Sequence, residues 1–361
     1  MSERAEIYVP ATARLPEDLK IRHDLLEPAR IAGYQTGLML LIKQGDLDPD
    51  NVRRQIDNLG PFANMSRAER PVLFGMHPNK PLDGPNRFNF LDNGARSQDY
   101  LEGSIDLVAQ LPSEFTPPSG RALTFHLNTL VRPENWVSDE DYWARAFEDV
   151  LARVRDSAAY AQRQGVTLAV ETTPVTEFGD MPRTSDYLLD DGHTYWADLG
   201  NPWPLFFWRD EIQRLRDAGT GIVTDTCHSF IALRTALEVQ RLAGEGRGSE
   251  ALKTYMIHPS DVEAAPPIDE FANMVIDNTK PGDVWHVNDA SGMRTTEGLQ
   301  GEDRIFEEGI ALFEGDIPAD QLQQIVESGL KMPIKLVIEV NEEDYTENPN
   351  TKKSLKAMNF D

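Results

Sequence analysis

The sequence predicts an α/β protein that folds as a single (β/α)8 barrel, in which parallel strands alternate with helices. The chain has 361 residues, a usual length for such a barrel with loop insertions. Short apolar runs alternate with amphipathic stretches from end to end, as parallel strand–helix units do. Six of the eight expected strands finish within a residue or two of His, Glu or Asp. Because the loops after the strands carry the chemistry of such barrels, we expect these side chains to converge.

The expected strands are short apolar runs. In chain order they are Ile7–Val9, Thr36–Ile42, Val72–Met76, Ala122–Phe125, Thr167–Val170, the Ile222–Val223 run, Val284–Val287 and Ile334–Ile338. The third to the eighth strands deliver His77, His126, Glu171, Asp225, the pair His286 and Asp289, and Glu339.

The expected helices are amphipathic stretches with start and stop signals. Asp48 is an expected N-cap with Pro49 in the first turn, and Gly165 follows the longest helix. Pro28 lies in the first turn of the first helix. The helices are Leu25–Ala32, Pro49–Leu59, Asp99–Leu111, Asp139–Arg163, Leu205–Asp217, Leu233–Leu242 and Ala319–Ser328.

We expect one domain over residues 1–361, with two insertions and a polar tail. The insertions span about 172–204 and 244–267, and the tail, about 341–361, contains a short helix candidate. Tryptophans at 196, 203 and 208 could form a sugar-stacking wall or could anchor the first insertion to the barrel. The sequence shows no internal repeat and no low-complexity tract.

Composition restricts the partners of the protein. The formal net charge of −25 repels nucleic acid and acidic membrane surfaces over the average face, which disfavours nucleic acid without ruling it out. Cys227 is the only cysteine, so no intramolecular disulfide can form, which fits a reducing compartment. The first residues lack a signal pattern, and no apolar run approaches the ~20 residues that span a bilayer. We therefore expect a cytoplasmic protein without a membrane partner, and the sequence leaves a homo-oligomer open.

The run GIVTDTCHSF, residues 221–230, organises the site. Asp225 and His228 follow a buried strand, and a carboxylate with a neutral imidazole suits zinc, manganese or iron. The alternative is a helix N-cap aspartate followed by a partly exposed histidine. Cys227 is interpreted as a packed thiol rather than a nucleophile, because no separate His/Asn partner set is evident.

The candidate ligands would meet at one mouth of the barrel. They are His77, His126, Glu171, Asp225, His228, His286 and Glu339. Glu171, Asp225, His286 and Glu339 form a four-ligand set, and His77 with His126 could hold a second ion that Glu171 bridges. Without metal, three clustered carboxylates would repel, and at least one should hold a proton. His23 is expected to be a surface or cap residue, and His193 and His258 are expected to be solvated or locally hydrogen-bonded within the insertions.

Several short motifs resemble those of the xylose isomerase-like TIM barrel superfamily. This group includes endonuclease IV, of AP endonuclease family 2, and many sugar isomerases and epimerases. The resemblance spans about Val72 to Val340. It is carried by DTCHSF at 225–230, HVNDAS at 286–291, EGDI at 314–317, LAVE ending in Glu171 and LVIE ending in Glu339.

The resemblance implies a role for each matching residue. Glu171, Asp225, His286 and Glu339 would be the metal set common to isomerases and endonucleases. His77 and His126 would serve a second metal, as in endonuclease IV, and His228 would bind a third metal or contact substrate. The nuclease's third site also uses an Asp-x-His pair, but here Asp303 is followed by Arg304 and Ile305. The run ETTP after the glutamate strand also departs from the nuclease pattern, and both departures weigh against phosphodiester cleavage.

Two functions follow from this interpretation. The first is an isomerase, epimerase or dehydratase of a sugar, polyol or sugar phosphate, dependent on one to three zinc or manganese ions. Glu171 and Glu339 would exchange a substrate proton through a metal-stabilised enediolate, with His228 completing the catalytic set. The alternative is an endonuclease IV-like phosphodiesterase that acts on abasic DNA. A barrel that has lost its reaction is a third, weaker reading, since the ligand set is nearly intact.

Overall fold

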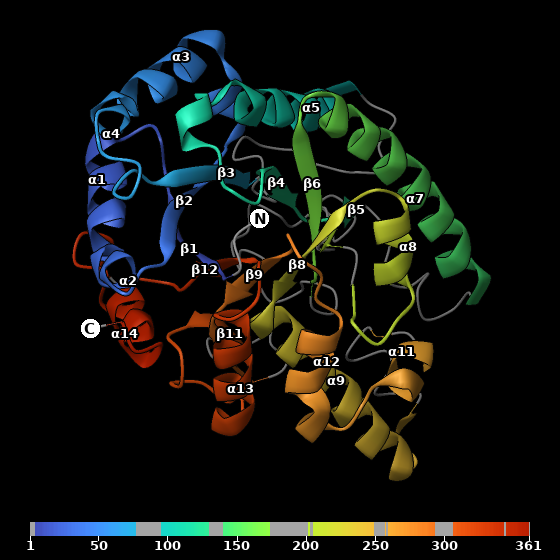
Figure 1. The fold of residues 1–361 in the computed structure, drawn as a ribbon. Coiled ribbons are helices and arrows are strands. Elements are labelled where there is room, and N and C mark those ends of the chain that lie inside the picture. Colours follow the sequence, from blue (N-terminus) through green and yellow to red (C-terminus); the bar gives the residue numbers. More distant parts are fainter. Residues whose placement is uncertain are drawn as a thin grey trace, which may run out of the picture.

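The computed structural model shows a closed barrel of eight parallel strands surrounded by helices (Figure 1). It describes residues 4–76, 95–129, 140–173, 201–202, 205–248, 257, 259–292, 306–342 and 344–360. The barrel order is β1-β12-β9-β8-β6-β4-β3-β2. The strands are β1 Glu6–Ala11, β2 Gln35–Leu41, β3 Val72–Met76, β4 Arg121–Phe125, β6 Val166–Glu171, β8 Gly221–Asp225, β9 Val284–Val287 and β12 Lys335–Ile338. Each overlaps an expected apolar run, so the predicted (β/α)8 barrel is confirmed.

The inside of the barrel is a packed apolar layer. Side chains alternate along a strand, so residues two apart face the same way. Tyr8, Met39, Phe74, Val223 and Val337, from five different strands, pack together in this layer. Gly37 leaves room for Tyr8, because a Cβ at this position would lie 2.3 Å from the Tyr8 ring. The layer separates the two ends of the barrel, as expected of a filled barrel rather than a pore.

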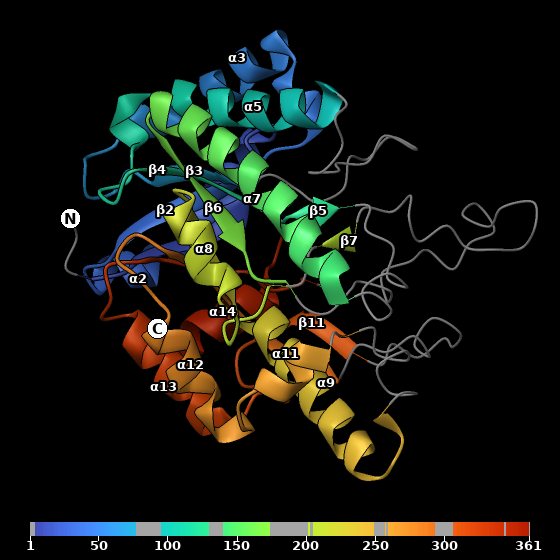
Figure 2. The ribbon, with the colours of Figure 1, turned by 90° about the vertical axis from the view of Figure 1, so that its right-hand side faces the viewer.

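The helices cover the outside of the barrel, and a second apolar cluster fills the space between them and the strands (Figures 1 and 2). They are α1 Pro16–Leu25, α2 Glu27–Ile31, α3 Pro49–Asn58, α4 Gly60–Ala63, α5 Ala95–Gln110, α7 Glu140–Arg163, α8 Glu211–Asp217, α9 Thr226–Gly244, α11 Pro259–Ala264, α12 Phe271–Asp277, α13 Ala319–Gly329 and α14 Pro349–Ala357. Short 3-10 helices span Gln44–Leu47, Ser113–Phe115 and Ile268–Glu270. Asp48 caps α3 as predicted, by accepting from the Asp50 N–H at 3.0 Å. No helix in the described part of the chain is long and apolar enough to cross a membrane.

The predicted start of the helix over Leu25–Ala32 is wrong. The structure has a helix that ends at Leu25 and a new one, α2, that begins at Glu27. Pro28 explains the break, because proline has no N–H to continue the helix and is tolerated only in a first turn. His23 consequently lies inside α1, buried with its ring edge against Phe62, rather than at the surface.

Three other helices differ from the prediction at their starts. The helix expected over Asp99–Leu111 begins four residues earlier, at Ala95. Only Glu211–Asp217 of the expected Leu205–Asp217 helix is helical. The helix expected over Leu233–Leu242 begins much earlier, at Thr226, directly after the strand. No loop therefore separates the sixth predicted strand from its helix.

The polar tail is packed against the barrel rather than solvated. Leu355, Met358 and Phe360 are buried in the outer core, and the Phe360 ring meets Tyr34 edge-on at 5.3 Å. These three apolar residues face the barrel. The mostly polar composition of the tail gives no indication of this packing.

The described parts of the insertions also pack. Trp208 stacks on Phe206 at 4.8 Å and donates to the Asp261 carbonyl at 3.0 Å, so this tryptophan anchors a loop. The expectations for Trp196, Trp203, His193 and His258 lie outside the described residues.

Two small antiparallel sheets stand beyond the carboxyl ends of the barrel strands (Figure 2). One pairs β5 Asn128–Thr129 with β7 Asn201–Pro202, and the other pairs β10 Asp289–Gly292 with β11 Phe306–Ile310. The second sheet brings Glu308 to the mouth of the barrel.

Candidate functional site

The predicted ligands come from the carboxyl ends of neighbouring strands and meet at one mouth of the barrel. Within the described residues, three groups have ligand atoms that all lie within 4.8 Å of one another. Two of them contain only histidines and carboxylates: Glu171, Asp225, His286 and Glu339, and His126, Glu171 and His228. The third consists of Asp225, Cys227 and His228. His77 and Asp303, the other predicted ligands, lie outside the described residues.

The four-residue group is arranged around His286. Its Nδ1 lies 2.6 Å from Glu339 Oε2, 3.3 Å from Glu171 Oε1 and 3.8 Å from Asp225 Oδ2. His286 and Asp225 are register partners on adjacent strands, which is why their side chains face each other. The sequence predicted this set, and the parallel register brings it together.

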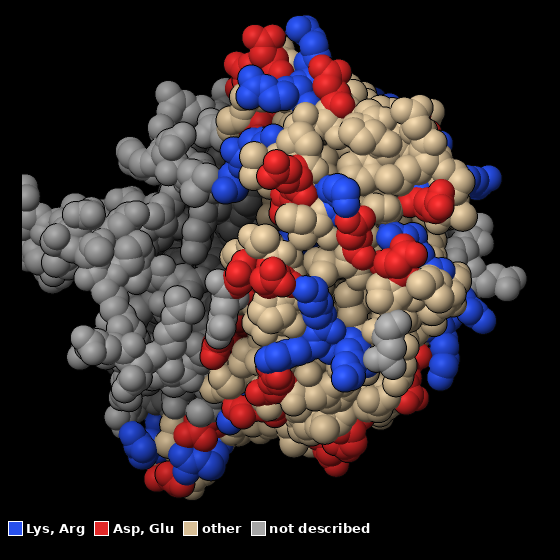
Figure 3. Space-filling model, turned by 90° about the vertical axis from the view of Figure 1, so that its left-hand side faces the viewer, with Lys and Arg blue, Asp and Glu red and all other residues tan. Residues whose placement is uncertain are grey.

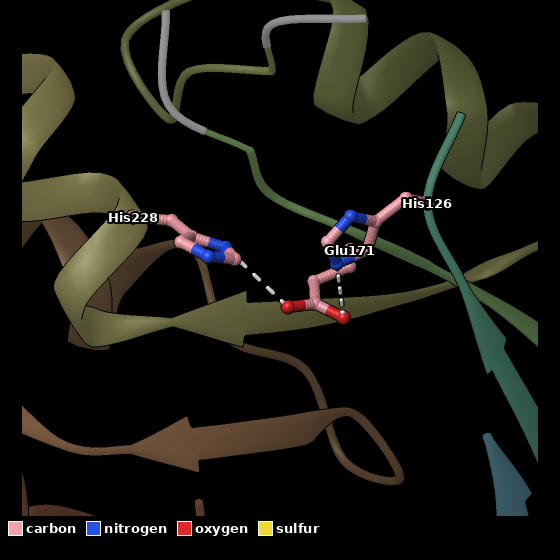
Figure 4. A group of neighbouring side chains, drawn as sticks. All are labelled: His126, Glu171 and His228. Carbon is pink, nitrogen blue, oxygen red and sulfur yellow. Dashed lines mark ion pairs between the residues drawn. The ribbon is translucent and has the colours of Figure 1, made fainter. Parts of the chain in front are cut away.

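Glu171 belongs to both groups that contain only histidines and carboxylates. Figure 4 draws it with His126 and His228. Its Oε2 lies 2.9 Å from His126 Nε2, and its Oε1 lies 3.4 Å from His228 Nδ1. The two imidazole rings meet edge-on, with centroids 5.6 Å apart. Glu171 is therefore placed where a carboxylate could bridge two ions, as the sequence suggested.

The hydrogen bond of His228 determines which ring nitrogen faces the site. His228 Nδ1 lies 3.0 Å from the Thr172 carbonyl oxygen, which can only accept, so Nδ1 carries the proton. When the ring is neutral, the Nε2 lone pair is available, and Nε2 lies 4.0 Å from Glu308 Oε1. His228 thus presents Nε2, rather than Nδ1, to a metal or substrate.

Asp225 is both a helix N-cap and a candidate metal ligand, the two roles that the sequence left open. Its Oδ1 accepts from the His228 N–H at 2.9 Å and caps α9, while Oδ2 points toward His286. His228 is only 8% exposed, so the expectation of a partly exposed histidine is wrong. Cys227 is buried, in agreement with a packed thiol, and it lies beside Asp225 and His228.

Asn288 holds the site together and was not singled out from the sequence. Its Nδ2 donates to Asp225 Oδ2 at 3.2 Å and to the Glu339 carbonyl at 3.1 Å. Its Oδ1 accepts from the Thr226 hydroxyl and the Cys227 N–H, both at 3.0 Å. The signal was present, since Asn288 follows His286 by two residues in the HVND run and so faces the same way.

Burial and neighbouring charges shift the pKa values of these groups. Burial opposes ionisation of Glu171, but His126 and His286 hold its pKa well below the usual range. Burial raises the pKa of Asp225 against the opposing effect of His228. The raised Asp225 value is the direction expected for one carboxyl of a metal-free cluster.

The pKa values of His286 and His228 are raised, whereas that of Glu171 is lowered. Burial disfavours the charged form of His286, yet Glu339 and Glu171 raise its pKa well above the usual value. Burial likewise opposes the charge on His228, and Asp225, Glu171 and Glu308 raise its pKa. Protons on these rings supply the positive charge that a dication would otherwise supply.

The hydrogen bonding of the site fits a bound cation. In the described part of the chain, Glu171 Oε2, Glu339 Oε2 and both ring nitrogens of His286 are buried without a hydrogen bond. These atoms lie close to one another, but their angles do not satisfy the geometry of a hydrogen bond. Buried polar atoms are rarely left in this state, because each lost hydrogen bond costs about 1–3 kcal/mol. Convergent atoms of this kind are what ligands of a metal ion require.

The site opens into a cavity of about 410 Å³. The Glu339 side chain is 30% exposed, whereas Glu171 is 1% exposed at the bottom. The acidic lining is Glu171, Asp225, Glu308 and Glu339. Among the described lining residues the one lysine or arginine is Arg22, whose guanidinium lies over the Tyr345 ring at 5.5 Å. Neither Glu308 nor Arg22 lies in a motif, so sequence reasoning missed both.

Comparisons with known proteins give the fold. No protein-family model matches the sequence, and no curated protein matches it. A xylose isomerase domain protein from Planctomyces limnophilus is similar, with a TM-score of 0.51 and 13% identity over 98% of this chain and 94% of the other. D-allulose 3-epimerase from Methylomonas sp., solved with D-allulose, has a TM-score of 0.50 and 10% identity over 99% of this chain and 97% of the other. The predicted resemblance to xylose isomerase-like TIM barrels is therefore confirmed for the fold.

Proposed function

We propose that this protein is a divalent-metal-dependent isomerase or epimerase, or a dehydratase, that acts on a sugar, polyol or sugar phosphate. The observation that carries the proposal is the buried group of Glu171, Asp225, His286 and Glu339, which opens into a polar cavity of about 410 Å³. A cavity of this size and lining suits one small polyhydroxylated molecule. The fold shared with a D-allulose 3-epimerase supports the same substrate class.

The four-residue group would hold the first ion, zinc or manganese. His126, Glu171 and His228 would hold a second, and His77 and Asp303 remain predicted ligands. When bound, the metal acts as a Lewis acid that polarises a substrate carbonyl and stabilises developing negative charge.

Glu339 and Glu171 would exchange the substrate proton. The exposed part of Glu339 gives it access to a carbon beside the carbonyl. Glu171 is held ionised by its histidine neighbours, so it can accept a proton even though it is buried. Removal of the proton gives an enediolate, and its return to the neighbouring carbon or the opposite face gives the isomer or the epimer.

His228 would orient a substrate hydroxyl. Its Nδ1 proton is committed to the Thr172 carbonyl, so Nε2 is the atom available to accept a hydrogen bond from a hydroxyl. The Thr172 bond fixes the ring, which keeps this acceptor in one place.

An endonuclease IV-like phosphodiesterase is the second candidate, favoured by the Glu171 carboxylate that two ligand groups share. Charge weighs against it. Lys and Arg are interspersed with Asp and Glu on the face drawn in Figure 3, and the formal charge of the chain is −25. DNA binding usually depends on a concentrated basic surface.

One experiment separates the two functions. Protein loaded with manganese or zinc is incubated in D2O with ketoses including D-allulose, inososes and sugar phosphates, and NMR follows deuterium incorporation and product formation. The same preparations are tested for incision of a duplex carrying one abasic site. Carbon-bound deuterium that appears only with enzyme supports the isomerase or epimerase. Incision without exchange on any sugar would replace it with the nuclease.

A further inference from the structure

A second cavity, of about 400 Å³, lies at the opposite end of the barrel from the candidate metal centre. It is lined by the first residues of three strands, Glu6 of β1, Gly221 of β8 and Lys335 of β12. Ser119, from the connection before β4, and Asp283, from the connection before β9, also line the cavity. The apolar layer around Tyr8 and Val337 separates this cavity from the metal-centre mouth.

Lys335 is the unusual residue of this cavity. It is 1% exposed, and it faces the barrel interior two residues before Val337. Within the described part of the chain, its ammonium makes no hydrogen bond and no ion pair. Lysine is almost never fully buried without a partner, since its three donors and its charge lose their water.

The neighbouring carboxylates are already committed to other donors. Glu6 accepts from the Tyr8 hydroxyl at 2.7 Å, and from the N–H and hydroxyl of Ser119 at 2.9 and 2.8 Å. Asp283 accepts from Arg216 at 2.6 and 2.9 Å, from the Ile222 N–H and from the Lys280 N–H. Both carboxylates are thus engaged by other donors, and among the described residues neither forms an ion pair with Lys335, which lines the cavity.

The charges around the cavity favour an anion. Its lining contains three cations, Lys280, Arg216 and Lys335, against the two carboxylates of Glu6 and Asp283. This local excess of positive charge occurs in a chain whose formal net charge is −25. Burial also lowers the pKa of Lys335, with Glu6 and Asp283 opposing the shift, so an added anion would stabilise the charged amine.

We propose that the cavity at the amino end of the barrel is a binding site for a small oxyanion, a carboxylate or a phosphate, held by the Lys335 ammonium. A carboxylate or phosphate oxygen supplies the acceptor that the ammonium lacks, and a charge-assisted bond of this kind is the strongest available to it. The site does not depend on the proposed reaction, because the apolar layer lies between the two cavities.

The test measures binding of inorganic phosphate and of succinate to the metal-free full-length chain by calorimetry and thermal shift at matched ionic strength. We expect saturable binding of at least one probe. Lys335→Met, which keeps the apolar stem, should weaken binding about tenfold or more, as the loss of one charge-assisted hydrogen bond implies. Saturation by phosphate alone or by succinate alone identifies the anion class.

A second variant keeps the amine and fills the cavity. The Cβ of Gly221→Val would start 3.5 Å from the Ala169 Cβ, an ordinary contact, and its methyl groups would occupy the space. Gly221→Val should also abolish binding, whereas Lys353→Met, at an exposed side chain of α14, should leave it unchanged. If Lys335→Met fails to fold, Gly221→Val decides. The proposal is overturned if neither probe saturates, or if Lys335→Met and Gly221→Val both fold and bind like the unaltered protein.

Discussion

Lys335 begins β12 and Glu339 directly follows its last residue, and the two side chains line different cavities. The two-residue period of a strand turns both side chains into the barrel, and Val337 between them belongs to the apolar layer. One strand thus supplies the candidate proton-transfer carboxylate at one end and a buried amine at the other. Changes at either residue should act on one cavity only.

Glu339→Gln should abolish turnover and leave the fold intact. The amide keeps the size of the side chain but cannot accept a proton, so kcat should fall by roughly 10²–10⁴-fold. The measurement is sugar turnover and deuterium exchange, with circular dichroism to verify folding. Glu327→Gln, on the exposed side of α13, is the matched control and should be neutral. Normal turnover by Glu339→Gln would remove Glu339 from the mechanism.

Metal affinity should rise with pH. The metal-free site holds a proton on His286, whose pKa lies well above its usual value, and a metal needs the neutral ring. A proton must therefore leave as the metal binds, so affinity increases up to about tenfold per pH unit for each proton released. Calorimetry in two buffers of different ionisation enthalpy measures the released protons. Affinity that is independent of pH, with no proton released, would contradict the assignment.

Asn288→Ala should weaken metal binding about 10–100-fold, because Asn288 orients Asp225 and the Glu339 backbone. It should also reduce the free energy of unfolding by about 1–3 kcal/mol, since the buried Cys227 N–H loses its acceptor. Metal titration and urea unfolding separate the two effects. Asn273→Ala, at an exposed position on α12, provides the comparison. A loss of stability with unchanged metal affinity would restrict Asn288 to a structural role.

Arg22→Gln should discriminate between substrate classes. Arg22 is the cation among the described residues that line the metal-site cavity, so it is the candidate contact for a phosphate group. The KM for sugar phosphates should rise, while the KM for neutral sugars should change little. Arg53→Gln, whose side chain is exposed on α3, should affect neither. Equal effects on both classes would mean that Arg22 acts through packing against Tyr345.

Gly315→Ala should destabilise the protein by about 1–3 kcal/mol, the usual cost of forcing extra atoms into a packed site. A Cβ at Gly315 would lie 2.4 Å from Asp289 Oδ1 and 2.6 Å from the Ala290 carbonyl. Asp289 accepts from the Gly315 and Ile317 N–H groups, so this contact ties the EGDI turn to the HVND run. Gly45→Ala, with no atom near its Cβ, is the matched control in urea unfolding. Equal stabilities of the two variants would show that the turn can shift to accept a Cβ at residue 315 at little cost in free energy.

Local sequence patterns were sufficient to predict secondary structure where it depends on residues close together in the chain. The apolar runs that became strands and the Asp48 cap of α3 are examples, because both the two-residue period and an N-cap act over a few residues. The same reasoning failed for His23, and it did not indicate that the tail packs on the barrel. Their burial depends on partners far away in sequence, Phe62 for His23 and Tyr34 for Phe360.

The sequence by itself determined the barrel and the residue types at the carboxyl ends of its strands, because strand period and chain order fix which ends coincide. Only the tertiary structure decided which atoms meet. The bond to Thr172 directs His228 Nε2 into the site, and Asn288 joins three strands at Asp225. Glu308, Arg22 and Lys335 carry no motif, and their importance arises from the cavities that they line. A cavity is formed by segments that are distant in sequence, so no local pattern encodes it.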